Sequence, residues 1–334
     1  MSNQQELYAR VAQAANYQRT LQSLASRRKI NPYQDAFASA EYLELVRDNV
    51  QDLDAALAKV YDGILNAPAD GPAHFSRENT WVWGGPTPSW GGSMAKDASI
   101  QAANYFGFDN VMYVYGPHTE EMFEIHKNCR KIICHLGGNC RTEGAQQLGD
   151  VEEAENLSRM SLKYPNIVGG VIDDMIGNCG ARYSRNLYME MHKALKAHNP
   201  KLESYSVVYT HELDSPMLQA FRNMEFPDRI ILWTWNKNDL PGLEMNVEKT
   251  RYLFPGRKIM MGLFMFDYGL TVLPNDLPSI AFQLEMSRRL LKQNKIHDIV
   301  ILGDREINKC PAVAEYIREF FKKEFAAPCN SKGA

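Results

Sequence analysis

The sequence predicts a (β/α)₈ barrel preceded by an N-terminal helical extension, and three observations support this fold class. Short apolar runs alternate with amphipathic segments, eight such pairs occur in succession, and together they occupy roughly 250 residues, the usual length of this fold. Strands that alternate with helices pair in parallel through right-handed crossovers. We therefore expect a helical extension in residues 1–78, the barrel in residues 79–327 and a flexible tail in residues 328–334.

Residues 1–78 contain two helical patterns and no strand-like run. In the second pattern, apolar residues recur at alternating steps of four and three, which places them on one stripe of a helix. These residues are Val46, Val50, Leu53, Leu57, Val60 and Ile64. Such a stripe requires a partner surface. Packing on the barrel is the first interpretation, and a homodimer contact through these helices is the alternative.

Eight apolar runs in the barrel region are the expected strands. They span residues 81–84, 110–115, 131–136, 167–173, 204–210, 229–235, 258–266 and 298–302. Each run is followed by a segment with helical periodicity. These segments span residues 93–106, 119–129, 151–164, 184–197, 216–224, 243–254, 278–293 and 311–325. Prolines or asparagines separate several of them, as at Tyr164-Pro165-Asn166, which is typical of helix ends.

An open, doubly wound sheet is the competing architecture. Such a sheet usually carries a glycine-rich phosphate loop after its first strand. Here the first strand continues into Gly84-Gly85-Pro86-Thr87-Pro88, whose prolines suit a wide loop. The central strands are apolar on both faces, as expected for strands that are covered on both sides. The sequence therefore favours the barrel.

The composition is that of a globular protein without concentrated positive charge. The chain has 334 residues, of which 45% are hydrophobic and 23% charged, and its formal net charge is -3. Nucleic acids and anionic membranes favour basic surfaces, so neither is an expected partner. The longest dense apolar stretch, residues 259–266, is too short to span a bilayer. The polar N-terminus lacks the apolar core of a secretory leader, and the six cysteines lack a CxxC spacing, so we expect a cytoplasmic protein with free thiols.

The carboxyl ends of the strands are where barrels of this kind place their chemistry. The predicted strand ends therefore define a candidate site. The expected substrate-binding residues are Trp83, Tyr115, His135, Tyr209, His211, Glu212, Trp233, Trp235, Asn236, Tyr268, Asp304 and Glu306. Aromatic faces pack against the C–H groups of a sugar ring, while carboxylates and amides bind its hydroxyl groups. This set of residues suits a small saccharide or glycoside as the substrate.

Three aspartates are the expected catalytic residues. Asp173 and Asp174 end an apolar strand, and because successive side chains of a strand point to opposite faces, one of them should enter the barrel mouth. A carboxyl group confined near other carboxylates keeps its proton to a higher pH and can act as a proton donor. The alternative is that one aspartate caps the next helix and the other binds backbone amides. Asp267 follows its strand in the same way, with a turn before Gly269 as the alternative.

Several of the other candidates have structural interpretations as well. Asp304 and Glu306 flank an arginine, and this pattern equally predicts an ion pair. Trp233 and Trp235 share a strand parity and so face the same side, either as substrate platforms or as barrel core. His135 is also compatible with a hydrogen-bonded histidine in the core.

At these residues the chain resembles the glycoside hydrolase-type (β/α)₈ barrels, in particular their poorly characterised bacterial members. The resemblance covers residues 80–325 and rests on the VIDD motif at 171–174, LWTWN at 232–236 and GLFMFDYG at 262–269. It implies an acid or nucleophile at the end of strand four, which Asp173 or Asp174 would match. The large group that uses glutamates after strands four and seven would correspond to Asp174 and Asp267. Neither residue is a glutamate and the Asn-Glu pair of that group is absent, so the chain departs from the retaining two-glutamate pattern.

A glycosidase is the leading hypothesis, with no cofactor expected. Asp174 would protonate the leaving oxygen, and Asp267 or Asp173 would act as nucleophile, as base for water, or in orienting the substrate. Two carboxyl groups about 5 Å apart predict retention of the anomeric configuration, and a separation of about 6.5–9.5 Å predicts inversion.

Two other functions remain open. The first is a sugar isomerase, epimerase or hydrolase that depends on a divalent metal ion. Its ligands would come from His135, Asp173 or Asp174, His211, Glu212 and Asp267. The second is a carbohydrate-binding barrel without catalysis.

Overall fold

The computed structural model describes residues 74–86, 93–114, 116–137, 148–178, 184–221, 224–269 and 273–326. The chain divides into two compact units, Met1–Pro68 and Ala69–Ala334. The first unit lies outside the described residues, as does the tail at 328–334. The predicted helices of the extension, their apolar stripe and the homodimer contact therefore stay predictions.

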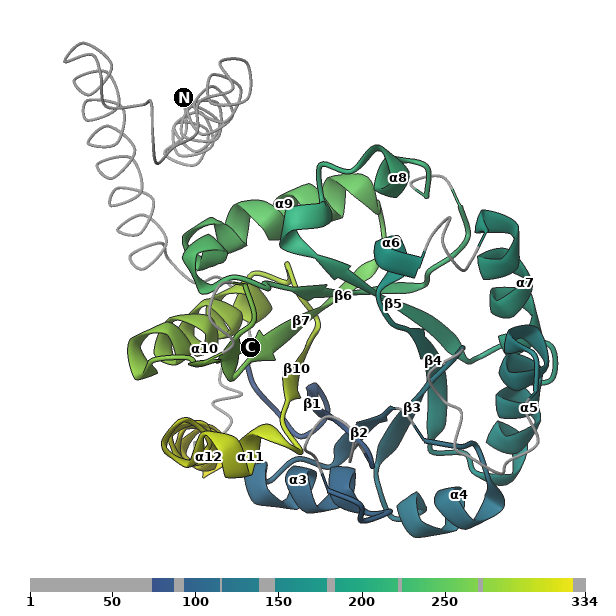
Figure 1. Ribbon diagram of the computed structural model, residues 1–334, viewed down its shortest axis with the longest axis horizontal. Coiled ribbons are helices and arrows are strands. Elements are labelled where there is room, and N and C mark those ends of the chain that lie inside the picture. Colours follow the sequence, from purple (N-terminus) through teal and green to yellow (C-terminus); the bar gives the residue numbers. More distant parts are fainter. Residues whose placement is uncertain are drawn as a thin grey trace, which may run out of the picture. The chain divides into compact units, whose positions relative to one another are not determined.

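A closed barrel of eight parallel strands forms the described part of the chain, which confirms the predicted fold class (Figure 1). The strands are β1 (Thr80–Gly84), β2 (Asn110–Tyr113), β3 (Lys131–His135), β4 (Ile167–Ile172), β5 (Glu203–Tyr209), β6 (Arg229–Trp233), β7 (Lys258–Phe264) and β10 (Asp298–Leu302). Their order around the barrel is β1-β10-β7-β6-β5-β4-β3-β2. The ring closes between the first and the last strand, where Trp81 pairs with Val300. A separate antiparallel pair, β8 (Phe266–Asp267) and β9 (Leu273–Pro274), follows β7.

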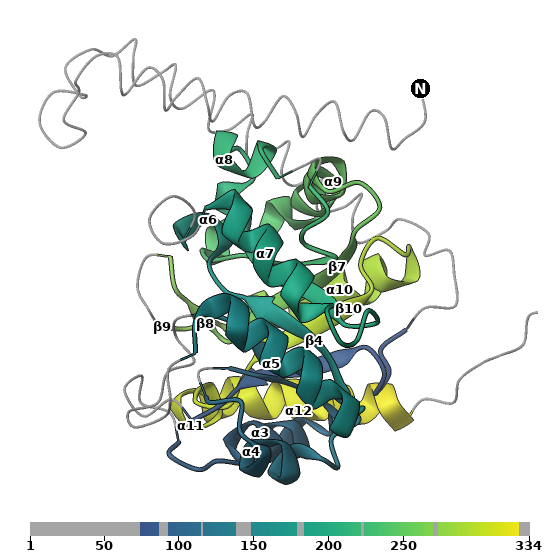
Figure 2. The ribbon, with the colours of Figure 1, turned by 90° about the vertical axis from the view of Figure 1, so that its right-hand side faces the viewer.

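Helices surround the barrel as an outer layer (Figures 1 and 2). They are α3 (Ala98–Phe106), α4 (Glu120–His126), α5 (Asp150–Lys163), α6 (Met175–Asn178), α7 (Arg185–Leu195), α8 (Pro216–Gln219), α9 (Leu243–Leu253), α10 (Leu277–Lys292), α11 (Glu306–Lys309) and α12 (Pro311–Ala326), with 3₁₀ helices η2 (Thr210–Glu212) and η3 (Lys237–Gly242). Side chains cap several helix starts: Thr119, Ser184 and Asp276 each accept a hydrogen bond from a backbone N–H in the first turn. No helix in the described ranges is long and apolar enough to cross a membrane.

Several strands end earlier than the apolar runs of the sequence predicted. The expected strand at 229–235 ends as β6 at Trp233, and that at 258–266 ends as β7 at Phe264. The apolar side chains that follow, such as Trp235, lie in the loops at the barrel mouth, where the backbone N–H of Tyr268 donates to the Trp235 carbonyl. An apolar run thus marks a strand together with the beginning of the loop that shapes the mouth.

The barrel interior is filled by large aromatic side chains that face glycines on neighbouring strands. Trp233 stacks on Phe264 with ring centroids 4.4 Å apart, and it meets Trp83 edge to face at 5.9 Å. A Cβ on Gly262 would lie 2.0 Å from the Trp233 indole, so only glycine leaves room for that ring. Trp83 and Trp233 expose 3% and 2% of their surface. These two predicted substrate contacts are therefore part of the packed core.

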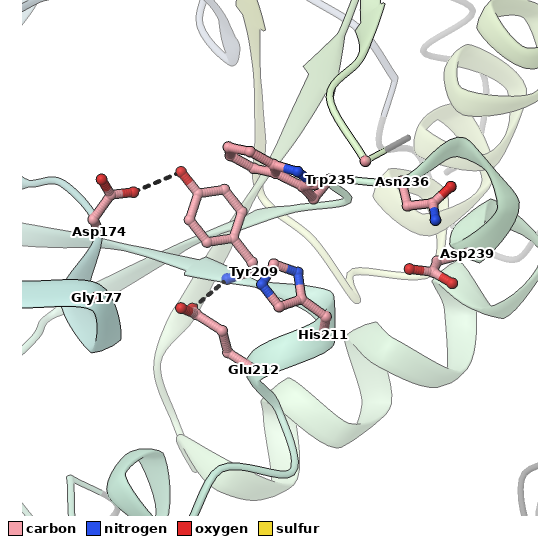
Figure 3. Close-up of a pocket in the computed structure, with 9 residues that line it drawn as sticks. Asp174, Gly177, Tyr209, His211, Glu212, Trp235, Asn236 and Asp239 are labelled. Atoms are coloured by element: carbon pink, nitrogen blue, oxygen red, sulfur yellow. Dashed lines mark hydrogen bonds between the residues drawn. The ribbon is translucent and has the colours of Figure 1, made fainter. Parts of the chain in front are cut away.

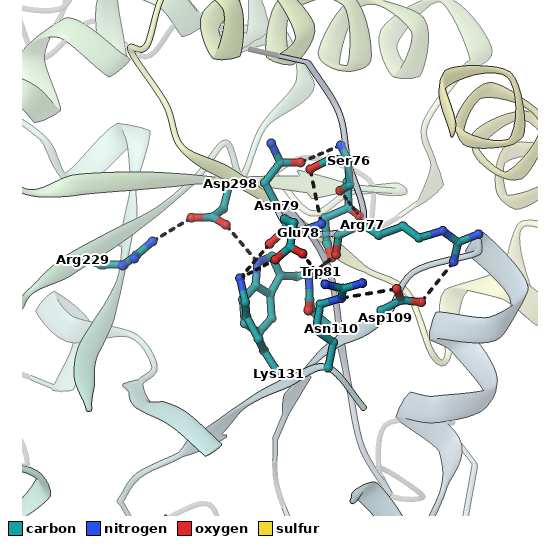
Figure 4. A network of polar contacts seen from close by, with 12 residues as sticks. Ser76, Arg77, Glu78, Asn79, Trp81, Asp109, Asn110, Lys131, Arg229 and Asp298 are labelled. Atoms are coloured by element: carbon teal, nitrogen blue, oxygen red, sulfur yellow. Dashed lines mark hydrogen bonds and ion pairs between the residues drawn. The ribbon is translucent and has the colours of Figure 1, made fainter. Parts of the chain in front are cut away.

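A network of partly buried charges closes the other end of the barrel, at the amino ends of the strands (Figure 4). The Arg229 guanidinium donates to Asp298 Oδ2 at 2.8 Å and forms an ion pair with Glu203 at 2.6 Å. The indole N–H of Trp81 donates to the other oxygen of Asp298 at 3.1 Å, and the Lys131 amine lies 6.0 Å from the Trp81 ring centroid. Burial raises the pKa of Asp298, and Arg229 opposes this shift. The network joins β1, β5, β6 and β10 on the amino-terminal side of the aromatic core.

Candidate functional site

A pocket of roughly 380 Å³ opens at the carboxyl ends of β4, β5, β6 and β7 (Figure 3). It is lined by Asp174, Gly177, Tyr209, His211, Glu212, Trp235, Asn236, Asp239 and Gly269. Four consecutive strands of the barrel thus contribute to it. This is the face on which (β/α)₈ barrels place their chemistry.

Asp174 enters the pocket from an unusual backbone conformation. It follows β4 with φ at 47°, in the left-handed region that side chains other than glycine rarely occupy. The carboxylate of Asp173 accepts a hydrogen bond from the Asp174 backbone N–H at 2.9 Å. The two neighbouring aspartates therefore have separate surroundings: Asp173 binds the turn, and Asp174 lines the pocket. Strained backbone of this kind is common at functional sites.

Tyr209, at the end of β5, holds two carboxylates of the pocket at once. Its hydroxyl donates to Asp174 Oδ1 at 2.7 Å, and its backbone N–H donates to Glu212 Oε2 at 3.0 Å (Figure 3). The short helix η2 returns the Glu212 side chain toward the strand end and makes the second bond possible. One residue therefore orients carboxylates from two different loops.

Burial shifts the pKa of three groups in the pocket. It raises the pKa of Glu212, and the negative charge of Asp174 raises that pKa further, while the hydrogen bond from Tyr209 opposes both effects. Burial also raises the pKa of Asp239. The same cause lowers the pKa of His211, although Asp239 opposes that shift. Glu212 therefore keeps its proton to a higher pH than an ordinary glutamate.

Three aromatic rings form one corner of the pocket. His211 stacks on Tyr209 with centroids 5.5 Å apart and an interplanar angle of 12°. Trp235 stands at 88° to the Tyr209 ring with centroids 5.1 Å apart. It exposes 37% of its surface, in contrast to the core tryptophans. Of the predicted aromatic contacts, these three lie in the pocket.

Asp267 lies beside the pocket and not in its lining. The residue is 3% exposed, and its Oδ1 accepts hydrogen bonds from the backbone N–H groups of Lys237 at 3.2 Å and Gly269 at 3.1 Å. These bonds tie together the loops after β6 and β7. The geometry corresponds to the turn interpretation, and the predicted catalytic role of Asp267 stays a prediction.

The candidates after β10 form a second, buried cluster. Glu306 accepts a hydrogen bond from the Tyr268 hydroxyl at 2.8 Å and forms an ion pair with Arg305, as the alternative interpretation of this segment predicted. Asp304 accepts from the backbone N–H of Gly85 at 3.0 Å, and burial raises its pKa to about 6. None of these residues is in the described lining of the pocket.

The remaining predictions fall elsewhere. His135 lies in β3 and is 3% exposed, outside the described lining of the pocket, and Tyr115 lies outside the described residues. In the described ranges, no group of three or more histidines, cysteines, aspartates or glutamates is arranged to hold a metal ion.

Three lining residues were not predicted from the sequence, Gly177, Asp239 and Gly269, and of these Asp239 alone carries a functional side chain. It lies in η3, three residues after Asn236, whose side chain caps the turn by accepting from the Asn238 backbone N–H at 2.9 Å. The available signal was the Asn236-Lys237-Asn238-Asp239 segment directly after β6, which is typical of a capped helical turn. Such a turn carries its fourth residue back over the strand end.

Comparisons with known proteins give likenesses of fold only. No protein family matches the sequence, and no curated protein matches it. The chain is similar to active domain 2 of a thermostable chitinase from Pyrococcus furiosus, with 11% identity and a TM-score of 0.47, covering 69% of this chain and 85% of that one. It is also similar to TsXylA, an intracellular xylanase from Thermoanaerobacterium saccharolyticum, with 12% identity and a TM-score of 0.42, covering 72% and 90%.

A third similar structure is the xylanase-alpha-amylase inhibitor protein XAIP-I in complex with trehalose. It is 11% identical with a TM-score of 0.47, and the match covers 72% of this chain and 97% of that one. The closed ring of eight parallel strands confirms the predicted fold, and the comparisons identify no specific family. At such identities a shared barrel does not establish a shared reaction, since one fold hosts many functions.

Proposed function

We propose that the protein is a glycoside hydrolase that cleaves a small saccharide or glycoside with a pair of carboxyl groups, Glu212 and Asp174. One observation carries this proposal: Tyr209 holds both groups in the same pocket, one by its hydroxyl and the other by its backbone N–H. Glycosidases of most families require two carboxyl groups that flank the scissile bond and differ in protonation.

Glu212 is the proposed proton donor. Its Oε2 accepts the Tyr209 N–H, whereas its Oε1 has no hydrogen bond to any described residue and is available to a substrate. Burial and the nearby Asp174 charge favour the protonated form of Glu212. Sequence reasoning assigned this role to Asp174 and placed Glu212 among the binding residues. The geometry supports the exchange of the two roles.

Asp174 is the proposed second carboxylate, acting on the anomeric carbon or on a water beside it. The Tyr209 hydroxyl at 2.7 Å orients it, and its left-handed backbone directs it away from the neighbouring Asp173. Trp235 offers an exposed ring face on which the C–H groups of a sugar can pack. The spacing of the two carboxyl groups in the substrate complex then decides between retention and inversion.

A panel of small α- and β-glycosides tests the function. We expect the full chain to release reducing sugar from at least one of them, and the double variant Asp174→Asn, Glu212→Gln to release none while it keeps its circular dichroism spectrum. Binding without turnover across the panel overturns the proposal in favour of a carbohydrate-binding protein. Turnover that is lost with a chelator and restored by a divalent metal overturns it in favour of metal-dependent chemistry.

The ionisation of Glu212 gives an independent prediction. A ¹³C carboxyl titration by NMR, with the Glu212 signal identified by its absence in Glu212→Gln, should show a pKa above the usual value of about 4.3. In Asp174→Asn this pKa should fall, because the charge of Asp174 disfavours the ionised form of Glu212. A Glu212 pKa that does not move in Asp174→Asn contradicts the proposed coupling. In the wild-type enzyme, turnover should fall as the pH rises through the same pKa, since the donor loses its proton.

A further inference from the structure

We propose that the pocket selects a substrate with an ammonium group, an amino sugar whose amine is free, and that Asp239 pairs with that group. This inference rests on the proposed function, because it names the class of sugar that the same site accepts. It starts from the Asp239 carboxylate, which the pair Glu212 and Asp174 leaves unused. Asp239 lines the pocket, and its carboxylate accepts no hydrogen bond and forms no ion pair with any described residue.

The charge of the pocket favours a cation. Three carboxyl groups line it: Glu212 is the proposed proton donor, and Asp174 and Asp239 supply negative charge, while the described lining contains no lysine or arginine. His211 does not offset them at neutral pH, because burial lowers its pKa and keeps the ring neutral. A confined pocket whose walls carry one sign of charge concentrates ligands of the opposite sign.

Two lysines on η3 and α9, next to the pocket, form ion pairs with acids outside the pocket lining. The Lys237 amine lies 3.4 Å from Asp276 Oδ2, and Lys249 forms an ion pair with Asp214. Burial raises the pKa of Asp239, His211 opposes this shift, and the negative charge of the buried Asp267 adds to it. An ammonium group at this position would offset the repulsion among the acids, whereas a neutral hydroxyl would not.

The aromatic corner provides a second, independent attraction for a cation. The rings of Tyr209 and Trp235 stand at 88° to each other, and His211 stands at 76° to Trp235. Cations are attracted to the faces of aromatic rings, most strongly to tryptophan. In Figure 3 Asp239 lies on the far side of Trp235 from Asp174. An amino group directed to Asp239 thus leaves the reacting pair on the other side of the ring.

Equilibrium binding of three monosaccharides to the full chain tests the inference. Glucosamine carries an ammonium group, glucose has a hydroxyl in its place, and N-acetylglucosamine has a neutral amide. By isothermal titration we expect glucosamine to bind about 10-fold more tightly than either neutral sugar, with a preference that shrinks as salt is added. Equal affinities for the three sugars overturn the inference.

Asp239→Asn is the decisive variant. It should bring the glucosamine affinity down to the glucose affinity of the same variant, because it removes the charge and preserves the shape. Glu121→Gln, on the exposed surface of α4, removes one charge far from the pocket and should keep the preference. A preference that survives in Asp239→Asn overturns the assignment of Asp239.

The binding experiment separates this inference from the proposed function, since it does not depend on turnover. Selective binding of glucosamine by a protein that cleaves no glycoside would refute the hydrolase and keep the inference. Cleavage of neutral glycosides by a protein that binds the three sugars equally would refute the inference and keep the hydrolase.

Discussion

Replacement of Glu212 by glutamine should lower kcat by about 10³-fold on glycosides whose leaving group is a sugar or a simple alcohol, which corresponds to about 4 kcal/mol of transition-state stabilisation. These leaving groups are poor and require a proton as the bond breaks. A dinitrophenyl glycoside releases dinitrophenolate, a stable anion that needs no proton, so the same variant should retain activity on this substrate within about 10-fold. Glutamine keeps the size of Glu212 and its acceptor oxygen for the Tyr209 N–H.

Asp174→Asn is the matched comparison. It should lose activity by about 10³-fold on both kinds of substrate, because the missing carboxylate acts on the sugar and not on the leaving group. Steady-state kinetics on the two substrates measures the difference, and Glu121→Gln on α4 serves as the control for loss of one negative charge. Equal losses on both substrates in Glu212→Gln would remove this residue from the donor role.

Replacement of Arg229 by methionine should destabilise the barrel by about 3 kcal/mol, the lower end of the range for breaking a buried ion pair. Its guanidinium joins Asp298 and Glu203, and the side chains of Arg229 and Asp298 are only 16% and 10% exposed. Methionine preserves the aliphatic part of the side chain but leaves two carboxylates without their partner. Calorimetry should show a melting temperature lower by about 6–12 °C, since each kcal/mol corresponds to about 2–4 °C in a domain of this size.

Lys96→Met provides the control for that experiment. Lys96 forms an ion pair with Glu121, but both side chains are 65% exposed, and such pairs contribute little to stability. The melting temperature of Lys96→Met should stay close to that of the wild type. A wild-type melting temperature in Arg229→Met would mean that the closed end of the barrel does not depend on its charges.

The barrel was predictable because its signals are local. Each strand is an apolar run and each helix an amphipathic stripe, and both periods can be read within a short window. The strand ends were less predictable. Trp233 and Trp235 share a parity, yet one lies in the core and the other in the pocket. Trp233 fits into the core because Gly262 on the neighbouring strand β7 leaves room for its ring. No pattern within β6 predicts this space.

The roles of the acids were the least predictable part of the site. Asp267 and Asp174 each follow an apolar strand, but backbone amides surround the first and the left-handed turn directs the second into the pocket. Aspartate is one of the few non-glycine residues that favour that conformation, but this preference does not tell Asp174 from Asp267. Asp239 reaches the pocket because the helical turn η3 folds back over the end of β6. Its number of residues from the strand end does not reveal this position.

At Asp174 the backbone conformation and the side chain make separate demands on the residue type: φ favours glycine, whereas the proposed chemistry requires a carboxylate. Glycine adopts that conformation without strain, so the fold should tolerate glycine there although the Tyr209 hydroxyl loses its acceptor. The same exchange would delete the carboxylate. Selection for a folded protein alone therefore does not preserve the proposed activity, and any such campaign on this protein has to hold position 174 constant.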